Sequence, residues 1–192
     1  MASAGSTVLS TAEARRETVI AAAVTGFSRH GYLGTPIAAV AQLANISPAY
    51  VFKLFPGKES LFVAALDRCY SLIETALTEG ADAAADQSPD GVLYAMGGAY
   101  ADLIVDKELL MLQVHAQAAT DVPEIAAAVR RGLERITNLA RRRSGAADAE
   151  VQRFIAFGQL CHLTVTTGLD ASSGEWARVL LNGIRHRTPN GG

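Results

Sequence analysis

Along most of the chain, apolar residues recur every three or four positions, which is the spacing of the buried face of an α-helix. No stretch of useful length alternates apolar and polar residues with the period of two that half-buried strands require. Capping residues, prolines and glycines divide the pattern into nine segments. The helices predicted are 10–31, 35–44, 47–55, 57–79, 88–105, 107–119, 121–143, 148–169 and a last one that includes Trp176 and Ile184. The pattern therefore predicts an all-α fold.

Two of these helices are short and follow each other closely. Thr35-Pro36 is a helix start, because threonine can cap free backbone N–H groups and proline suits the first helical position. Ser47-Pro48 repeats that signal just after Asn45, a residue that tolerates the left-handed conformation of a tight turn. Two helices joined by so short a turn must cross steeply, so the pattern predicts a helix-turn-helix.

The second of these short helices divides into two faces. Val51 and Phe55, four residues apart, are expected to point into the core. Tyr50 and Lys53 offer a hydroxyl and a cation that can reach the phosphates or base edges of DNA. The residues expected on the outer side are Pro48, Ala49, Tyr50, Lys53 and Leu54. The alternative is an ordinary solvated surface helix.

Lys58 adds a cation at the start of the next helix. A lysine in a first turn opposes the helix dipole, at a cost of about 0.3–1 kcal/mol, and an anion bound by the backbone N–H groups there would offset it. After a helix-turn-helix, Lys58 therefore indicates a phosphate contact. The full set of predicted DNA-binding residues is Thr35, Ser47, Pro48, Ala49, Tyr50, Lys53, Leu54 and Lys58.

Residues 12–65 resemble the DNA-binding domain of the TetR family of transcriptional regulators. The positions that carry the resemblance are Gly31-Tyr32, Thr35, Ile37, Val40-Ala41, Ile46-Ser47, Val51, Phe55, Lys58-Glu59 and Leu61-Phe62. The resemblance implies an all-helical dimer that releases DNA when a small molecule binds the C-terminal domain. Two positions depart from the family pattern. Phe52 stands where a tyrosine is usual, which removes a phosphate-contacting hydroxyl, and Pro48 stands where a basic residue is common.

Charge and composition limit the possible functions. The formal net charge is −2, which argues against a wholly basic nucleic-acid binder, but residues 1–60 carry a net charge of +2 and the remainder −4. This asymmetry has the sign expected of a DNA-binding head on an acidic body. Cys69 and Cys161 follow no metal or disulfide spacing, and no signal peptide or membrane span is indicated, so a cytoplasmic protein is expected.

The predicted domains follow from these helices. Residues 1–10 and 188–192 are expected to be disordered tails, and residues 11–56 the helix-turn-helix domain. Residues 57–187 are expected to form a connecting helix and a ligand-binding and dimerisation domain. The connecting helix has no interior glycine or proline, so it should be stiff, and movement at its far end would swing the head.

The body offers candidate ligand-binding residues but no enzyme motif. There is no phosphate-binding glycine loop, no nucleophile elbow and no histidine–acid metal pair on one helical turn, so we expect no enzyme, cofactor or metal site. Gly97 and Gly98, inside helix 88–105, either permit close helix packing or leave room for a ligand.

The family resemblance implies a small-molecule pocket in the body, and its aromatic, methionine, amide and histidine residues are the candidates for lining it. Those residues are Tyr94, Tyr100, Met111, Gln113, His115, Phe154, Phe157 and His162. The alternative for each of them is an ordinary place in the core.

The last two helices have the composition of an interface. Helix 148–169 is apolar or small on most sides, so it needs burial on more than one side. In position, the last two helices resemble the pair through which family members dimerise as a four-helix bundle. The interface residues expected on this basis are Phe157, Leu160, Cys161, Thr164, Trp176, Leu180 and Ile184.

The leading hypothesis is a ligand-responsive repressor. It binds a pseudo-palindromic operator in double-stranded DNA as a homodimer and is released by a small-molecule effector. The alternative, from a different class, is a helical small-molecule carrier or enzyme whose head binds no DNA.

Overall fold

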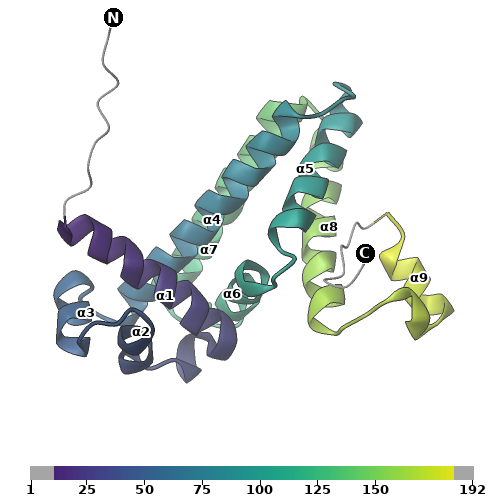
Figure 1. Cartoon of the computed structure of the whole chain (residues 1–192). Coiled ribbons are helices and arrows are strands. Elements are labelled where there is room, and N and C mark those ends of the chain that lie inside the picture. The colour runs from purple at the N-terminus through teal and green to yellow at the C-terminus, as the bar shows by residue number, and fades with distance from the viewer. Residues whose placement is uncertain (1–10, 184–192) are drawn as a thin grey trace, which may run out of the picture.

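The computed structural model describes residues 11–183, and all of its regular structure is helical (Figure 1). The elements are α1 (Thr11–Gly34), α2 (Ile37–Leu43), α3 (Pro48–Leu54), α4 (Lys58–Asp82), α5 (Pro89–Leu103), α6 (Glu108–Gln117), α7 (Pro123–Ser144), α8 (Asp148–Thr166), the 3-10 helix η1 (Ala171–Ser173) and α9 (Glu175–Leu181). No strand occurs within residues 11–183, and the predicted all-α class is confirmed. Ser10, Ile184 and the two predicted tails lie outside the described residues.

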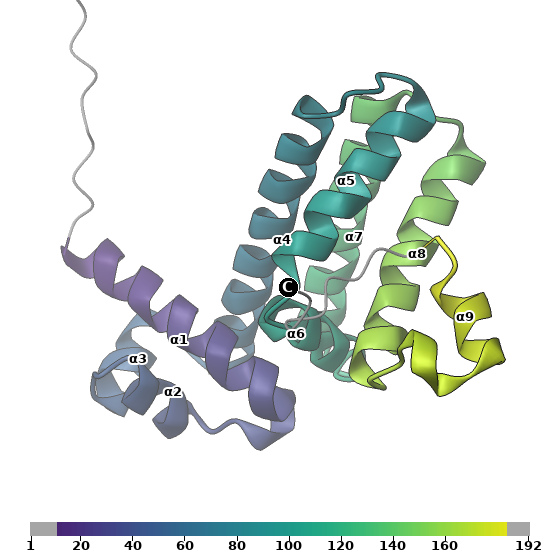
Figure 2. The same ribbon diagram turned by 45° about the vertical axis from the view of Figure 1, so that its right-hand side comes forward.

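The helices form two groups, which Figures 1 and 2 show from two directions. The head consists of α1, α2 and α3 at one end of the molecule. The body consists of α4 to α9, and α4 runs from the head to the opposite end. In both views α9 lies beyond α8, on the side away from the head. Across the described residues, no single helix is long and apolar enough to cross a membrane, although the bent pair α2–α3 jointly has the required length and composition.

An apolar core holds the head and continues into α4. Phe27 of α1 packs edge-to-face on Phe62 of α4 with the ring centroids 4.7 Å apart, and Tyr32 packs on the same ring at 5.4 Å. Val40 of α2 and Val51 of α3 are buried in the same cluster. Because close-packed interiors transmit displacement, a movement of α4 is expected to move the head with it.

In the body, α4 packs closely against α7. Gly132 of α7 allows this approach, because the ring of Tyr70 occupies the place where a side chain on residue 132 would lie. Arg135 of α7 also pairs with Glu74 of α4. Exposed ion pairs contribute little to stability, so we attribute the α4–α7 contact mainly to apolar packing around the glycine.

Gly31 interrupts α1 where the sequence predicted its end. Its backbone is not helical (φ 69°), a conformation that glycine adopts without strain, and a short further stretch beyond this kink reaches Gly34. Thr35 is buried, and its hydroxyl donates to the carbonyl oxygens of Gly26 at 3.1 Å and Gly31 at 2.8 Å. The N-cap residue of α2 is Pro36, and no side chain caps this helix. The prediction that Thr35 caps α2 is therefore wrong.

Helix α6 joins the head to the body, since it packs on α1 as well as on α4, α7 and α8. Its His115 lies directly against the kink in α1. A Cβ atom on Gly31 would be only 2.9 Å from His115 Nδ1, so the absence of a side chain at residue 31 makes room for the imidazole. A displacement of α6 would therefore act on the end of α1.

The remaining helix boundaries lie within a few residues of the predicted ones. The predicted loop 80–90 is shorter, because α4 continues to Asp82. Ser88 starts α5 as predicted, since its hydroxyl accepts the Gly91 N–H at 3.1 Å. Helix α8 ends at Thr166, shortly before Gly168 turns the chain with φ 65°.

Candidate functional site

The head carries the predicted helix-turn-helix. Helices α2 and α3 are bent by 100° across a short turn, which is within the range of this motif. In the turn, Asn45 adopts the left-handed conformation with φ 53°, and the N–H of Ile46 donates to the carbonyl of Ala41 at 3.0 Å. The turn predicted at Asn45 is confirmed.

The start of α3 is also as predicted. The Ser47 hydroxyl accepts the Tyr50 N–H at 3.2 Å, and Pro48 occupies the first helical position. A helix of seven residues would not be stable alone. The cap and the packing of Val51 in the head core therefore fix both the start and the orientation of α3.

The outer face of α3 differs from the predicted one. Val51 and Phe55 are buried as predicted. Leu54, expected outside, is half-buried and packs against the core of the head. Phe52, which the sequence prediction left out, is 54% exposed. The exposed side chains of α3 are those of Pro48, Ala49, Phe52 and Lys53, and Ser47 is exposed just before them.

Tyr50 lies at the edge of this face, between two cations. The guanidinium carbon of Arg15 is 5.5 Å from the centre of the Tyr50 ring, and Lys53 Nζ is 6.0 Å from it. Each such contact at an exposed site contributes about 0.5–1 kcal/mol. Arg15 was not among the predicted residues, because its place beside Tyr50 depends on how α1 lies against α3.

Lys58 is the first residue of α4 and lies beside the end of α1. Its Nζ donates to the Leu33 carbonyl at 3.2 Å and lies 4.8 Å from the centre of the Tyr32 ring. Partial burial lowers the pKa of Lys58, against the opposing effect of the Glu59 carboxylate. The Tyr32 hydroxyl donates to Glu59 Oε1 at 2.6 Å, and burial together with this bond raises the pKa of Tyr32 to about 12.

Thr35 does not belong to this surface. Its side chain is 1% exposed and its hydroxyl is engaged with two carbonyl oxygens of α1. The expectation of a phosphate contact through this side chain is therefore corrected, because the hydroxyl instead ties α1 to the segment that starts α2.

A second candidate site is a cavity of about 250 Å³ inside the body. Side chains of α4, α5, α6, α7 and α8 line it, and its apolar walls include Ile73, Leu77, Leu93, Leu133 and Ile136. Gly97 and Gly98 also line it, so these two glycines leave space open, which was one of the two readings of their sequence. Five predicted pocket residues are brought together here, namely Tyr94, Tyr100, Gln113, Phe154 and Phe157.

One end of the cavity is polar but uncharged. The Tyr100 hydroxyl lies 2.8 Å from His162 Nε2, and Gln113 Nε2 donates to the Tyr100 hydroxyl at 3.2 Å. Burial lowers the pKa of His162 to about 4 and raises the pKa of Tyr100 well above its usual range, so both side chains are neutral near pH 7. His162 Nδ1 is buried without a hydrogen-bond partner.

Three predicted pocket residues do not line the cavity. His162 lies behind Tyr100 and reaches the cavity only through the hydrogen bond with it. Met111 packs in a separate small cluster with Ile104 and Leu110. His115 contacts the end of α1 instead.

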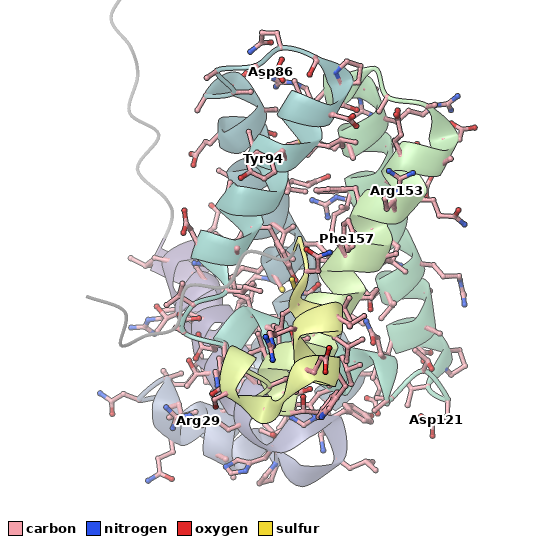
Figure 3. All side chains as sticks on the ribbon, turned by 90° about the vertical axis from the view of Figure 1, so that its right-hand side faces the viewer. Arg29, Asp86, Tyr94, Asp121, Arg153 and Phe157 are labelled. Carbon is pink, nitrogen blue, oxygen red and sulfur yellow. The ribbon has the colours of Figure 1, made fainter. Side chains whose placement is uncertain are left out.

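The opening of the cavity carries charged residues that the sequence prediction missed. Arg153 of α8 and Asp90 of α5 line this part, and both side chains are exposed. Figure 3 shows Tyr94 on α5, and Arg153 and Phe157 on α8, on either side of the space between the two helices. Arg153 lies one helical turn from Phe157, and that spacing was the only signal in the sequence that could have indicated it.

The predicted dimer-interface residues divide between two environments. Cys161 and Thr164 are buried inside the protomer, so the expectation that their side chains face a partner is corrected. Leu160 and Leu180 are half-buried, Ile184 lies outside the described residues, and Phe157 and Trp176 are exposed. Leu163 and Val179 are exposed as well, although neither was predicted.

Histidine, cysteine and acidic side chains are dispersed over the described residues. Among residues 11–183, no group of three or more histidine, cysteine or acidic side chains is placed to hold an ion. Cys69 and Cys161 are buried free thiols, and burial raises the pKa of Cys69 to about 12 and of Cys161 to about 11.

The structure is that of a helix-turn-helix protein with a separate helical body. The second helix of the bent pair is exposed, and a long helix joins the pair to a body that contains a cavity. Residues 19–65 match the family described as "Bacterial regulatory proteins, tetR family". The resemblance to the TetR family of transcriptional regulators that was read from the sequence is therefore confirmed over residues 19–65.

A curated relative supports the same domain. Over 53 residues the chain is 36% identical to the HTH-type transcriptional regulator RutR of Escherichia coli K12. The match covers 28% of this chain and 25% of RutR, so the chain spans about a quarter of that relative's length.

Solved structures show that the fold extends over the body. A TetR-family transcriptional regulator from Agrobacterium tumefaciens superposes with a TM-score of 0.68 at 16% identity, over 91% of this chain and 96% of that one. The transcriptional regulator FadR from Bacillus subtilis, in complex with stearoyl-CoA, gives 0.66 at 16% identity, over 88% and 99%. At such identities the likeness establishes a shared fold.

Proposed function

We propose that this protein is a ligand-responsive transcriptional repressor. It binds a pseudo-palindromic DNA operator as a homodimer, in the bacterial cytoplasm, and leaves the operator when a small molecule occupies its body. The observation that carries the proposal is the outer face of α3, which is exposed, held in place by the Ser47 cap and flanked by the cations Arg15 and Lys53. A short exposed helix with cations at its edge suits the major groove of DNA.

The contacts to DNA divide into positioning and reading. Lys53, Lys58 and Arg15 hold phosphates, and Tyr50 reaches base edges between two of these cations. The small side chains at the start of α3 let its backbone approach the groove closely. Leu54 contributes from the inside, by fixing α3 on the core.

The dimer places two heads on one duplex. In a two-fold dimer the two copies of α3 would lie about 34–36 Å apart, in successive major grooves. Residues 11–56 serve as the DNA-binding domain and 57–187 as the ligand-binding and dimerisation domain. Exposed apolar side chains on α8 and α9 support an interface there, namely Phe157, Leu163, Trp176 and Val179.

The effector is a compact, mainly apolar molecule whose buried end carries an uncharged hydrogen-bonding group. The cavity walls are apolar, and the network of Tyr100, Gln113 and His162 at the polar end offers hydrogen bonds but no charge. A charged ligand group there would lose hydration without gaining a counter-ion. The stearoyl-CoA complex of FadR supports small-molecule binding by a protein of this fold.

Coupling between the two sites follows from shared helices. The cavity is lined by α4, which carries the head, and by Gln113 of α6, which packs on α1. A ligand that shifts either helix alters the orientation of the heads, and by thermodynamic linkage DNA and ligand weaken each other's binding by the same factor.

Gel retardation with the DNA upstream of the protein's own gene tests DNA binding, with an unrelated fragment of equal length as the control. We expect retardation at low salt that the unrelated fragment competes away only weakly. No retardation at low salt would favour the alternative, a helical carrier or enzyme without DNA binding.

A ligand screen by thermal shift tests the second half of the proposal. A compound that raises Tm should also release the DNA. The variant Gly97→Leu, which fills the cavity beside Phe154, should lose the shift in Tm while retaining DNA binding. A compound that still stabilises this variant binds elsewhere.

A further inference from the structure

The outer face of α3 is largely apolar. Pro48, Ala49 and Phe52 are exposed on it, and Phe52 follows Pro48 by four residues and Ala49 by three, so its ring lies on the same face as both. Phe52 is 54% exposed and belongs to neither apolar cluster of residues 11–183. The rest of α3 is anchored in the core, but this phenyl ring is exposed to water. Its burial against a partner would lower the free energy.

Polar groups lie at the edge of this face. The hydroxyl of Ser47 caps α3 by accepting the Tyr50 N–H, and Lys53 and Arg15 flank the Tyr50 ring. Cations at that edge suit the phosphates of a DNA strand. The three apolar side chains have no donor or acceptor, so hydrogen bonding cannot be how they distinguish bases.

The major groove offers one apolar group that differs between base pairs, the C5-methyl group of thymine. Phenylalanine and alanine both make apolar contacts with that methyl group. We propose that Phe52, together with Ala49, reads thymine C5-methyl groups in each half of the operator. The inference rests on the proposed DNA-binding function and adds the chemistry by which α3 recognises its sequence.

The absence of a polar group at residue 52 agrees with this role. Phenylalanine has no hydroxyl with which to contact a phosphate. The exposed ring can therefore make only apolar contacts. In the major groove, the apolar groups that differ between base pairs are the thymine methyl groups.

Binding-site selection from random duplex DNA with the full chain supplies the operator for the test. Each thymine of one half-site is then replaced singly by deoxyuridine, which removes only the methyl group. Fluorescence anisotropy at fixed salt measures Kd for the unmodified chain and for Phe52→Ala, whose fold should persist because the ring is exposed.

We expect one or two of these replacements to weaken binding of the unmodified chain about fourfold, the factor that burial of one methyl group is worth. In Phe52→Ala, replacement of the thymine that faces residue 52 should have no effect, whereas replacement of a thymine that faces only Ala49 should keep its effect. Phe52→Leu, which keeps an apolar side chain, should retain part of the discrimination, and Arg142→Ala, an exposed change in the body, should retain all of it.

The outcomes separate the inference from the function on which it rests. Selected DNA that is bound equally well with thymine and deoxyuridine at every position overturns the methyl contact but leaves DNA binding intact. A Phe52→Ala variant that discriminates as strongly as the unmodified chain at every position also overturns it. If no duplex is selected at all, the proposed function itself fails, and the exposed ring then belongs to a different interface.

Discussion

Lys58 stands at a helix start, where a positive charge opposes the helix dipole. The local contacts compensate for this, since Nζ donates to the Leu33 carbonyl and lies over the Tyr32 ring. Lys58 forms no ion pair of 4.0 Å or less within the described residues, and the neighbouring Glu59 carboxylate accepts the Tyr32 hydroxyl. The ammonium is thus held next to the N-terminus of a long helix, which is where a phosphate would bind.

We predict that Lys58→Ala weakens binding to every duplex by a similar factor. Loss of one phosphate contact should reduce the slope of log K against log salt by about one. Anisotropy titrations at several salt concentrations measure this slope. Arg142→Ala removes a charge at the far end of α7 and should leave it unchanged. An unaltered slope in Lys58→Ala would remove Lys58 from the phosphate contacts.

His162 gives a prediction for pH. Burial lowers the pKa of its folded form to about 4, below the ordinary value of 6.5. Between these values the unfolded chain binds a proton that the folded chain does not, so the free energy of unfolding falls as the pH falls, by about 3 kcal/mol in total. Urea titrations of the unmodified chain and of His162→Gln at pH 7, 6, 5 and 4.5 measure it.

The variant should show a shallower decrease in stability below pH 6.5, because glutamine does not titrate. Tyr100 and Cys161, the neighbouring titratable groups, both have raised pKa values, so they stay protonated over this range. His30→Gln, a change at an exposed site on α1, should keep the original slope. Equal slopes in all three proteins would contradict a buried neutral imidazole.

Sequence reasoning predicted the local structure of some candidate residues and not of others, and the reason differs from residue to residue. Ser47 and Asn45 were predictable, since caps and left-handed turns depend on local backbone chemistry. The outward direction of Phe52 instead of Leu54 was not, because a seven-residue helix has too few positions to fix its rotation on the core. The position of Arg15 beside Tyr50 was not predictable either, because it depends on how α1 packs against α3, which is distant in sequence.

At the scale of elements, the helices were predictable and the cavity was not. Capping residues, prolines and glycines mark helix ends whatever the tertiary structure. The cavity walls come from five helices, so no periodic pattern on one of them identifies a lining residue. The role of a helical glycine was also not predictable from the sequence. Gly97 lines the cavity, whereas Gly80 allows α4 to lie close to Ala95 and Met96 of α5.

Gly132 gives a prediction about helix packing. A methyl group on residue 132 would overlap the ring of Tyr70 where α7 crosses α4. Overpacking of this kind destabilises by about 1–3 kcal/mol, more than the gain of about 1 kcal/mol from replacing a helical glycine. We therefore expect Gly132→Ala to lower the free energy of unfolding in urea.

Gly158 of α8 is the matched control, because a methyl group there would meet no atom within 4 Å. Gly158→Ala should leave stability unchanged or raise it by up to about 1 kcal/mol. If both variants were equally stable, α7 would be able to move away from Tyr70, and Gly132 would not be needed for the close approach of α4 and α7.

At the scale of the whole molecule, the proposed function depends on two copies acting together. In the proposed dimer each head would contact one half-site, so a shift of α4 would matter because it would change the spacing between the two heads. The α8 and α9 surface carries large apolar side chains that are more than half exposed, including Leu163 and Trp176. Such surface is typical of an interaction site rather than of free solvent exposure.

The dimer prediction is that Leu163→Glu separates the two copies without unfolding either. Leu163 is 52% exposed, so its substitution leaves the protomer core intact, whereas a buried carboxylate at an apolar interface has no counter-ion. Light scattering after size exclusion should give twice the chain mass of 20.2 kDa for the unmodified protein and the single mass for the variant. Asn138→Glu, an equal charge change at an exposed site on α7, should remain dimeric.

The monomeric variant should also lose operator affinity, since the second half-site is no longer held at high effective concentration. A variant that stays dimeric would place the interface on another face, and an unmodified protein that is monomeric at all concentrations would rule out the paired geometry on which operator binding depends.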